Sequence, residues 1–216
     1  MPAKKKDTKK PESTRSVRKL VADVFASMDG VMQAPGGAEE DPDENFRHGG
    51  WSMAYWDEAM GKVMDETMAK PSEIVLGRKT YDIFVGYWPK RDDENAAILN
   101  RATKHVASRS RKKLEWANAS LLDLDVVAAV RALKQKPGPP LHTIGSANLL
   151  QTLLKNDLVD ELELWIFPVV VGTGKKLFDG GGIPTAWKLT KSVTSTTGVL
   201  MLHYERNGDI VYASAM

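Results

Sequence analysis

The chain has 216 residues, of which 42% are hydrophobic, so it can bury one substantial core and we expect a single domain. The formal net charge of +2 is too small to indicate a nucleic-acid partner by itself. The absence of cysteine excludes disulfides and thiolate metal sites and is compatible with a cytoplasmic protein, which is our expectation. No stretch approaches the apolar length of a membrane span, and the N-terminus has no hydrophobic signal region, so we expect no membrane partner.

Residues 1–17 differ in composition from the rest of the chain. They are rich in lysine and have almost no apolar side chains, so they cannot bury enough surface to fold. We interpret them as a disordered basic tail and residues 18–216 as one domain. A solvated extension is the simpler role for the tail, and contact with nucleic acid or an anionic surface is the alternative.

The first elements after the tail are a strand, a long loop and a helix. Residues 20–26 are an apolar run typical of a buried strand. The next loop carries an acidic run at 39–44, and a loop of this length in a compact domain is usually functional or mobile. Helical spacing predicts a helix at 51–69, which ends before Pro71.

The rest of the chain alternates short strands with helices and then becomes hairpin-like. The predicted strands are 74–76, 103–108, 141–144 and 159–171, and the predicted helices are 121–134 and 147–154. Residues 187–213 should form two or three antiparallel strands, with a tight turn at Asn207 and Gly208. This order of elements predicts an α/β fold, with a mixed sheet flanked by helices.

Three of the predicted strands end in residues suited to bind an anion. These residues are Gly77, Arg78, Lys79 and Thr80 after the first strand, Ser108, Arg109 and Ser110 after the second, and Gly145, Ser146, Ala147 and Asn148 after the third. The first turn of a helix has unpaired N–H groups and the positive end of the dipole, so it attracts phosphate. Gly145 lets a ligand approach the backbone, and Ser146 is a good N-cap.

The three strand ends predict a cofactor site because ligands in open α/β sheets bind at the carboxyl ends of strands. Each cluster alone is equally compatible with a solvated turn. Together they predict a dinucleotide with several phosphates, and the excess of arginine and lysine favours NADPH over NADH. The G-x-G-x-x-G fingerprint is absent, which argues against an ordinary Rossmann domain.

Short motifs follow one another in a fixed order between residues 18 and 207. They are FASMDG at 25–30, GGW at 49–51 with YWDE at 55–58, LGRKTY at 76–81, GYWP at 86–89, IGS at 144–146 and FPVVVG at 167–172. This ordered set resembles the dihydrofolate-reductase-like superfamily, and within it the stand-alone relatives of the reductase domain of riboflavin biosynthesis. The resemblance implies a three-layer fold with a mixed, mostly parallel sheet and C-terminal antiparallel strands. It also implies NADPH as cofactor and a homodimer.

The resemblance suggests where the substrate binds. The candidates are Asp29 and Asp57 as catalytic residues, and Ser27, Trp51, Tyr55 and Trp56 as substrate-binding residues. Asp29 would orient a substrate amide or hydroxyl or relay a proton, and a turn-forming role before Gly30 is the alternative. Asp57 would contact a pterin- or pyrimidine-like ring, or else complement the helix dipole. The aromatic residues would enclose a flat ring, or be plain core.

Two departures from the family pattern affect these expectations. Residues 31–35 contain no basic residue where riboflavin-pathway reductases usually have one, which puts binding of a ribose phosphate in doubt. Ser146 stands where the family usually has a second glycine, and we expect it to have a negative φ and to offer its hydroxyl to a phosphate.

The functional hypothesis is therefore an NADPH-dependent reductase of a small heterocyclic substrate. The best named reaction is that of 5-amino-6-(5-phosphoribosylamino)uracil reductase, and reduction of dihydrofolate or another pterin is the alternative. A non-catalytic NADP-binding protein is the hypothesis from another class. The four histidines have no ligand-type spacing, so we expect no metal site.

Overall fold

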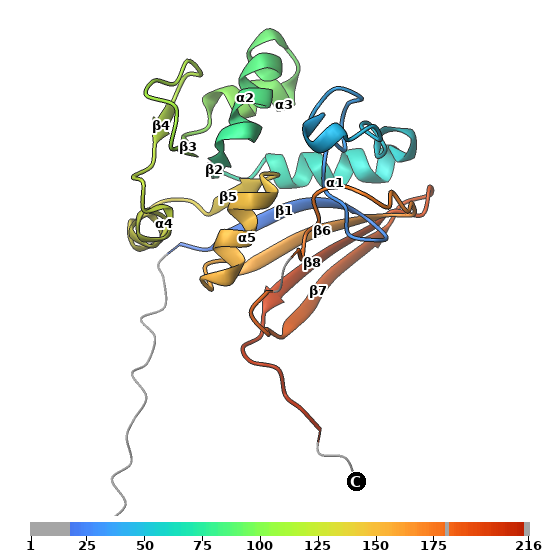
Figure 1. Ribbon diagram of the computed structural model, residues 1–216. Helices are drawn as coiled ribbons and strands as arrows, with labels where there is room; N and C mark the ends of the chain where they lie inside the picture. The colour runs from blue at the N-terminus through green and yellow to red at the C-terminus, as the bar shows by residue number, and fades with distance from the viewer. Residues whose placement is uncertain (1–17, 180–181, 214–216) are drawn as a thin grey trace, which may run out of the picture.

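An eight-stranded sheet with the order β4-β3-β2-β5-β1-β6-β8-β7 organises the computed structural model, which describes residues 18–179 and 182–213 (Figure 1). The strands are β1 (Leu20–Ser27), β2 (Glu73–Gly77), β3 (Lys104–Ala107), β4 (Ala119–Leu121), β5 (Leu141–Ile144), β6 (Glu161–Phe167), β7 (Trp187–Thr194) and β8 (Leu200–Arg206). The first six strands pair in parallel, whereas β8 is antiparallel to both β6 and β7. The predicted mixed, mostly parallel sheet with C-terminal antiparallel strands is thus confirmed. The expected basic tail lies outside the described residues.

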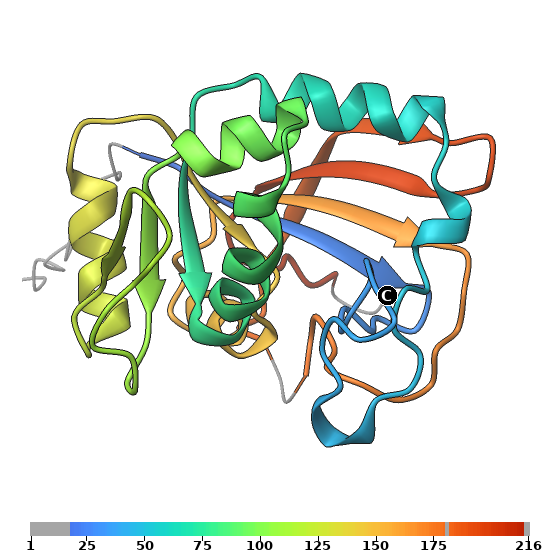
Figure 2. The same ribbon diagram turned by 90° about the horizontal axis from the view of Figure 1, so that it is seen from above.

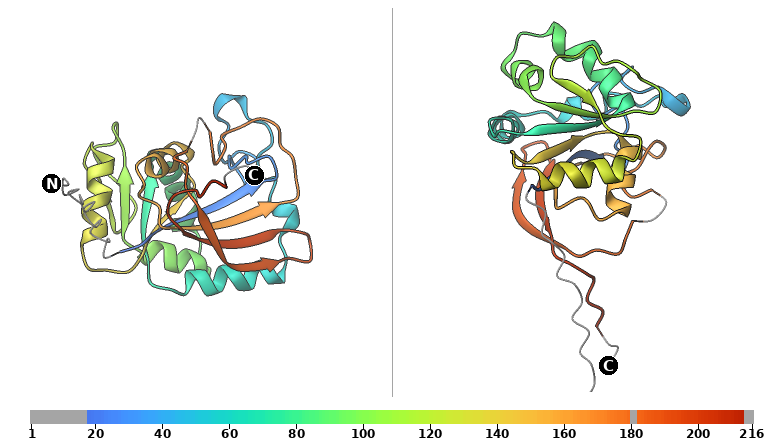
Figure 3. Two further views of the ribbon diagram at one scale, coloured as in Figure 1. Left: turned by 90° about the horizontal axis from the view of Figure 1, so that it is seen from below. Right: turned by 90° about the vertical axis from the view of Figure 1, so that its left-hand side faces the viewer.

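Helices cover both faces of this sheet. They are α1 (Glu58–Met68), α2 (Arg78–Tyr87), α3 (Glu94–Arg101), α4 (Val126–Gln135) and α5 (Ala147–Lys155). Helices α4 and α5 pack on one face, and α1, α2 and α3 pack on the other, where α1 runs along β6 and β8 (Figure 2). Figure 3 shows the sheet twisting between the two layers, with α4 nearest the viewer in its right-hand panel. The protein therefore has the expected three layers.

Strand β2 shows why short apolar runs predicted the centre of the sheet. Val75 packs in the cluster that contains α4 and α5, while Ile74 and Leu76 pack with α2 and α3 on the opposite face. A parallel strand covered on both faces needs apolar residues at every position rather than at alternate ones.

The helix predicted at 51–69 begins later, at Glu58. Asp57 is its N-cap, and its carboxylate accepts a hydrogen bond from the N–H of Met60 at 2.9 Å. The residues before it form a separate 3-10 turn, Met53–Tyr55, because Ser52 donates its hydroxyl to the carbonyl of Pro35. The continuous helical prediction was wrong there because a cap and a tertiary bond interrupt the pattern.

Three other boundaries differ from the predictions. The helix predicted at 121–134 begins at Val126, after the N-cap Asp125, because residues 119–121 pair with β3 as a strand. The strand predicted at 159–171 is shorter, since only Glu161–Phe167 pairs with its neighbours. Asn207 and Gly208 do not form a hairpin turn; they bond to Ala186, and residues 207–213 form no strand.

The large aromatic residues at the carboxyl end of β6 lie inside the protomer and not at a dimer interface. Trp165 and Phe167 are buried beneath α1, on a strand that lies between β1 and β8. They are therefore unavailable to a second copy, and the homodimer remains a prediction that would need another surface. None of the described helices is long and apolar enough to cross a membrane.

Candidate functional site

A large cleft of about 2010 Å³ lies between the carboxyl ends of the central strands and helices α1, α2 and α3. Every residue that the sequence predicted for the cofactor lines it: Gly77, Arg78, Lys79, Thr80, Ser108, Arg109, Ser110, Gly145, Ser146, Ala147 and Asn148. Strands β3, β2 and β5 are neighbours in the sheet and run parallel, so their carboxyl ends meet at one edge. The structure therefore brings the three predicted strand ends together.

A chain of hydroxyl groups joins two of these strand ends. The N–H of Gly77 donates to Oγ of Ser146 at 2.9 Å, and the Ser146 hydroxyl donates to Oγ1 of Thr80 at 2.6 Å. A Cβ atom on Gly77 would lie 2.6 Å from the Ser146 Oγ atom. Glycine is therefore required at residue 77, because the serine hydroxyl occupies the space of a side chain.

Ser146 differs from its expected conformation. Its φ is +56°, not negative, and it follows Gly145, whose φ is +59°. Two consecutive left-handed residues turn the chain from β5 into α5, and the hydroxyl bridges to α2 instead of capping α5. No side chain among residues 18–179 and 182–213 caps α2 or α5, so the first N–H groups of both helices remain available at the cleft.

The cations of the cleft differ in how strongly they are already paired. Arg78 forms an ion pair with Asp82 at 2.7 Å, and Arg111 binds the other oxygen of the same carboxylate. Lys79 forms an ion pair with Asp43 from the long loop. Arg109 is exposed and has no ion-pair partner within the described residues. Arg109 is thus the cation most available to a ligand phosphate.

The long loop after β1 forms one wall of the cleft and is held in place. The Gln33 side chain donates to the carbonyls of Asp41 and Asp43, and accepts from the N–H of Lys175. The Lys175 ammonium binds both aspartates, at 2.5 Å and 3.0 Å. These bonds tie the acidic loop to the segment after β6, beside the cleft that both segments line.

Asp29 and Ser27, which the sequence placed in the active site, do not line the cleft. The Asp29 carboxylate accepts bonds from the Ser27 hydroxyl and from the N–H groups of Val171 and Gly172. The Ser27 hydroxyl also accepts from the N–H of Val31. The geometry supports the alternative reading, in which Asp29 stabilises a turn and joins it to the loop after β6.

Asp57 also lies outside the cleft lining. Besides capping α1, its carboxylate accepts bonds from the backbone N–H and the hydroxyl of Thr196. Both carboxylate oxygens are therefore used to connect the start of α1 with the turn between β7 and β8. This is the helix-terminus role that the sequence left open.

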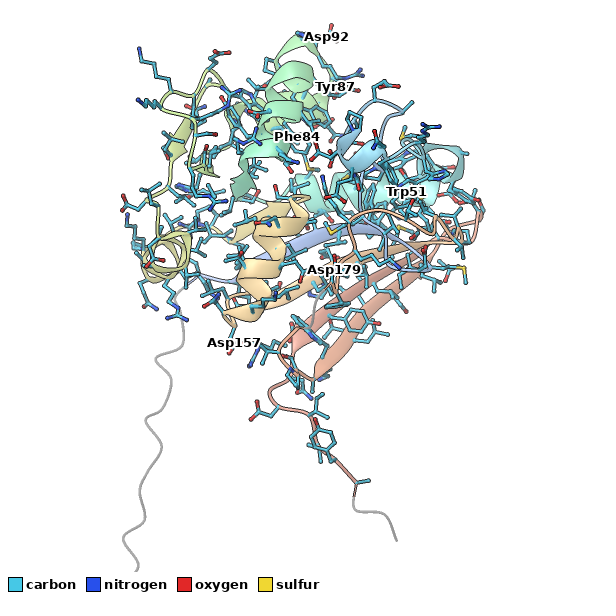
Figure 4. All side chains as sticks on the ribbon, viewed as in Figure 1. Trp51, Phe84, Tyr87, Asp92, Asp157 and Asp179 are labelled. Carbon is cyan, nitrogen blue, oxygen red and sulfur yellow. The ribbon has the colours of Figure 1, made fainter. Side chains whose placement is uncertain are left out.

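The three candidate aromatic residues divide into core and cleft. Trp51 and Tyr55 pack edge-on against Phe167, and the Trp51 indole donates to the carbonyl of Gln33. Trp56 is 41% exposed and lines the cleft beside Trp165. The opposite wall includes Phe84 and Tyr87 of α2, which Figure 4 labels above the sheet, well separated from Trp51.

The floor of the cleft contains charged residues that the sequence reading missed. Asp23 of β1, His142 of β5 and Glu163 of β6 line it, each in the middle of a short apolar strand. His142 Nδ1 lies 2.8 Å from Oδ2 of Asp23, and Glu163 bonds to His203 of β8 at 2.7 Å. A charged residue in a central strand is costly to bury, and that signal was present in the sequence.

One group of described residues has ligand atoms close enough to hold a metal ion. These atoms belong to Glu161, His203 and Glu205 and lie within 4.8 Å of one another. The Lys19 ammonium forms ion pairs with both glutamates, so a cation is already present there. The expectation of no metal site remains a prediction.

Comparisons with known proteins agree with this geometry. The family model of the RibD C-terminal domain matches residues 18–201. The uncharacterized proteins YyaP and YwjB of Bacillus subtilis (strain 168) are each 26% identical to the chain. Each match covers 88% of this chain, with 96% of YyaP and 98% of YwjB.

Solved structures share the fold at low sequence identity. A putative riboflavin biosynthesis protein from Shewanella sp. PV-4 has a TM-score of 0.58 at 18% identity, covering 88% of this chain and 99% of that one. A pyrimidine reductase-like protein from Corynebacterium diphtheriae has a TM-score of 0.60 at 14% identity, covering 89% and 93%. Dihydrofolate reductase from Enterococcus faecalis, complexed with NADP(H) and RAB-propyl, has a TM-score of 0.55 at 16% identity, covering 88% and 96%. The chain belongs to the RibD C-terminal domain family and has the dihydrofolate-reductase-like fold.

Proposed function

We propose that the protein is an NADPH-dependent reductase that transfers a hydride to a small heterocyclic substrate. The observation that carries this proposal is the convergence of three strand ends and two uncapped helix N-termini in one cleft that extends over the sheet. The family match and the NADP(H) complex of a protein with the same fold support it.

The residues at the edge of the sheet fit a dinucleotide phosphate. The N-termini of α2 and α5 offer N–H groups to a pyrophosphate, and Gly145 has no side chain between the ligand and the backbone. Arg109, between two serines on the β3 loop, is suited to a 2′-phosphate because its charge has no ion-pair partner in the part of the chain that the structure describes. When bound, NADPH would supply the hydride.

The remaining half of the cleft fits a flat ring. Its aromatic lining comes from the sheet and from both sides of the opening. The sheet contributes Phe25 and Trp165, the segment before α1 contributes Trp56, and α2 contributes Phe84. Apolar aromatic walls can stack against a heterocycle and exclude water from the reacting atoms. The cleft is open here, which favours an enzyme over the alternative of a non-catalytic NADP-binding protein.

The proposed substrate is the ribosylaminopyrimidine phosphate of riboflavin biosynthesis, and a pterin is the alternative. The family match and the pyrimidine reductase-like neighbour support the first, and the dihydrofolate reductase neighbour supports the second. The usual basic residue is absent after the first-strand turn, where Val31 is fully buried. Lys176, which also lines the cleft from the loop after β6, would have to bind the substrate phosphate instead, because the Lys175 ammonium already pairs with Asp41 and Asp43.

A binding titration followed by a turnover assay tests this function. Adding NADPH or NADH to the purified protein should change its tryptophan fluorescence, because Trp56 and Trp165 line the cleft, and NADPH should bind more tightly. The NADPH complex is then mixed with the ribosylaminopyrimidine phosphate or with dihydrofolate, and NADPH absorbance is followed. No binding of either nucleotide would contradict the proposal, whereas binding without turnover of any pyrimidine or pterin would favour the non-catalytic alternative.

A further inference from the structure

The cleft floor holds a carboxylate–imidazole pair to which the proposed cofactor and substrate contacts assign no role. Asp23 Oδ2 bonds to Nδ1 of His142 at 2.8 Å, and the two side chains are 24% and 17% exposed. An ion pair in the middle of a sheet contributes little net stability, because removing both groups from water costs about as much as their attraction returns. A functional reason for keeping the pair is therefore needed.

The pair lies next to the predicted cofactor turn. In the parallel register of β1 and β5, Asp23 is opposite Ile144, the residue directly before Gly145. His142 is three residues before Gly145, which is roughly 10 Å along an extended strand. Both side chains reach the same cleft as Gly145 and Ser146. A group on this part of the floor can therefore reach a substrate placed against the reacting end of the cofactor.

One imidazole nitrogen of His142 is available to a ligand. Nδ1 is used by Asp23, while Nε2 has no hydrogen-bond partner among the described residues. Among the described residues, the unpartnered side-chain polar atoms that are fully buried belong to Arg18, Thr143 and Arg206. The unpartnered Nε2 of His142 is not one of them, so it is accessible from the cleft that His142 lines. A carboxylate at Nδ1 fixes the ring orientation and leaves Nε2 to give or take the proton.

The surroundings of His142 favour its protonated form. Burial lowers the pKa of its imidazole, but the carboxylates of Asp23, Glu163 and Glu161 outweigh burial and raise the pKa above its ordinary value. On the other side, its register partner in β2 is the apolar Ile74. From the helix layer, the charged residue of α1 that lines the cleft is Asp65, which is also acidic. The raised pKa of His142 favours the imidazolium form, which is the form that can donate a proton.

We infer that His142, oriented by Asp23, is the proton donor of the reduction. The inference rests on the proposed reductase function and adds the acid that a hydride transfer needs. When bound, NADPH would supply a hydride to the carbon of a C=N bond, and the π electrons would move to nitrogen. That nitrogen takes the proton from Nε2 of His142. The products are NADP⁺, a C–H and N–H bond in the substrate, and a neutral imidazole that water reprotonates.

An NMR titration of the imidazole signals tests the placement of His142 without a substrate. The full chain has four histidines, so its imidazole spectrum is simple, and His142→Gln identifies the signal. The pKa of His142 is measured in the NADPH complex and in the NADP⁺ complex, which differs by a positive charge on the nicotinamide ring. A ring beside His142 should lower its pKa with NADP⁺ by about one pH unit relative to NADPH.

His203 is the matched internal control. It also bonds to a strand carboxylate, that of Glu163, but it does not line the cleft, so its imidazole NMR signals should change little when NADP⁺ replaces NADPH. The variant Asp23→Asn should lower the pKa of His142 in both complexes, as expected for a positioning residue.

Two results would overturn the inference in distinguishable ways. If both nucleotides bind, as judged by tryptophan fluorescence, and the pKa of His142 is equal in the two complexes, His142 is not beside the reacting ring. The proposed function would survive that result. If neither nucleotide changes the fluorescence, the reductase function fails, and the proton donor fails with it.

Discussion

The backbone N–H of Gly77 donates to the side-chain oxygen of Ser146 at 2.9 Å, across 69 positions of sequence. This bond joins the carboxyl ends of β2 and β5 directly beneath the site proposed for the cofactor phosphates. It explains why a serine in a left-handed conformation is tolerated at this turn, since its hydroxyl makes a second bond to Thr80. The two strand ends are thus coupled by hydrogen bonds within the protein.

The Ser146 bridge can be tested by two substitutions. Ser146→Ala removes both hydrogen bonds and keeps a Cβ atom at a positive φ, so it should destabilise the protein by about 1–3 kcal/mol. Ser146→Gly removes the same bonds but adopts this conformation freely, and should be less destabilising by about 1 kcal/mol. Urea unfolding of both variants measures the difference, with Ser110→Ala as control because Ser110 is exposed. Equal stability of all three variants would contradict the bridging role.

Arg109 should determine the preference for NADPH. Arg109→Ala is expected to lower the affinity for NADPH about tenfold or more, because a charge-assisted bond to the 2′-phosphate is lost. The affinity for NADH should stay unchanged. Arg78→Ala should have the smaller effect, since Arg78 is already paired with Asp82. Fluorescence titrations with both nucleotides measure this.

Lys112→Ala is the matched control for Arg109, because Lys112 is an exposed cation of the same loop that does not line the cleft. An equal loss of affinity for NADPH and NADH in Arg109→Ala would show that Arg109 does not bind the 2′-phosphate.

Asp29 should contribute an acid-sensitive part of the stability. Hydrogen bonds from Ser27 and from the N–H of Val171 hold the pKa of its carboxyl at about 2, below the 3.8 of the unfolded chain. Because the folded pKa is depressed, this contribution is fully present above pH 3.8 and is lost as the pH falls towards about 2. Asp29→Asn should therefore be less stable than the wild type near neutral pH and show a flatter response in this acid range.

Thermal unfolding across the acid range tests the role of Asp29. Asp92→Asn is the control, because Asp92 is an exposed aspartate at the tip above α2 and α3 (Figure 4). Parallel acid profiles for wild type and Asp29→Asn would mean that Asp29 makes no such contribution.

Lys104 should produce a second pH dependence of the same sign at alkaline pH. Its ammonium is fully buried and donates to the carbonyls of Asn100, Ala102 and Ala117. Burial lowers its pKa from 10.5 to about 8, so the unfolded chain binds the proton more tightly in that interval. Stability from this group should therefore rise with pH between about 8 and 10.5 and stay constant below it.

Lys104→Met should remove that alkaline rise and destabilise the protein by about 2–4 kcal/mol, because three carbonyls lose their donor. Urea unfolding at neutral and alkaline pH measures both effects. Lys113→Met, at an exposed lysine nearby, should leave both unchanged. A wild type and a Lys104→Met variant with the same alkaline slope would refute the assignment.

The sequence predicted the strand ends that line the cleft better than it predicted the surroundings of the candidate carboxylates. Gly77 and Gly145 follow apolar runs, and the parallel pairing of short buried strands places such ends at one edge. The residue types at the strand ends and the order of the strands therefore both predict a binding site at this edge of the sheet. Asp29 and Asp57 lie outside the cleft lining, and their carboxylates accept bonds from backbone N–H groups, which is the alternative role that a carboxylate after a strand or before a helix can have.

The sequence by itself determined the strand–helix order, the buried strands and the residues at their ends, because these depend on neighbours within a few positions. Only the tertiary structure decided which charged residues meet. Asp23 and His142 are 119 positions apart and become partners through the pairing of β1 with β5. The conformation of Ser146 was decided the same way, by a hydroxyl reaching Gly77 on another strand. Such contacts depend on strand order and register, which no local pattern specifies.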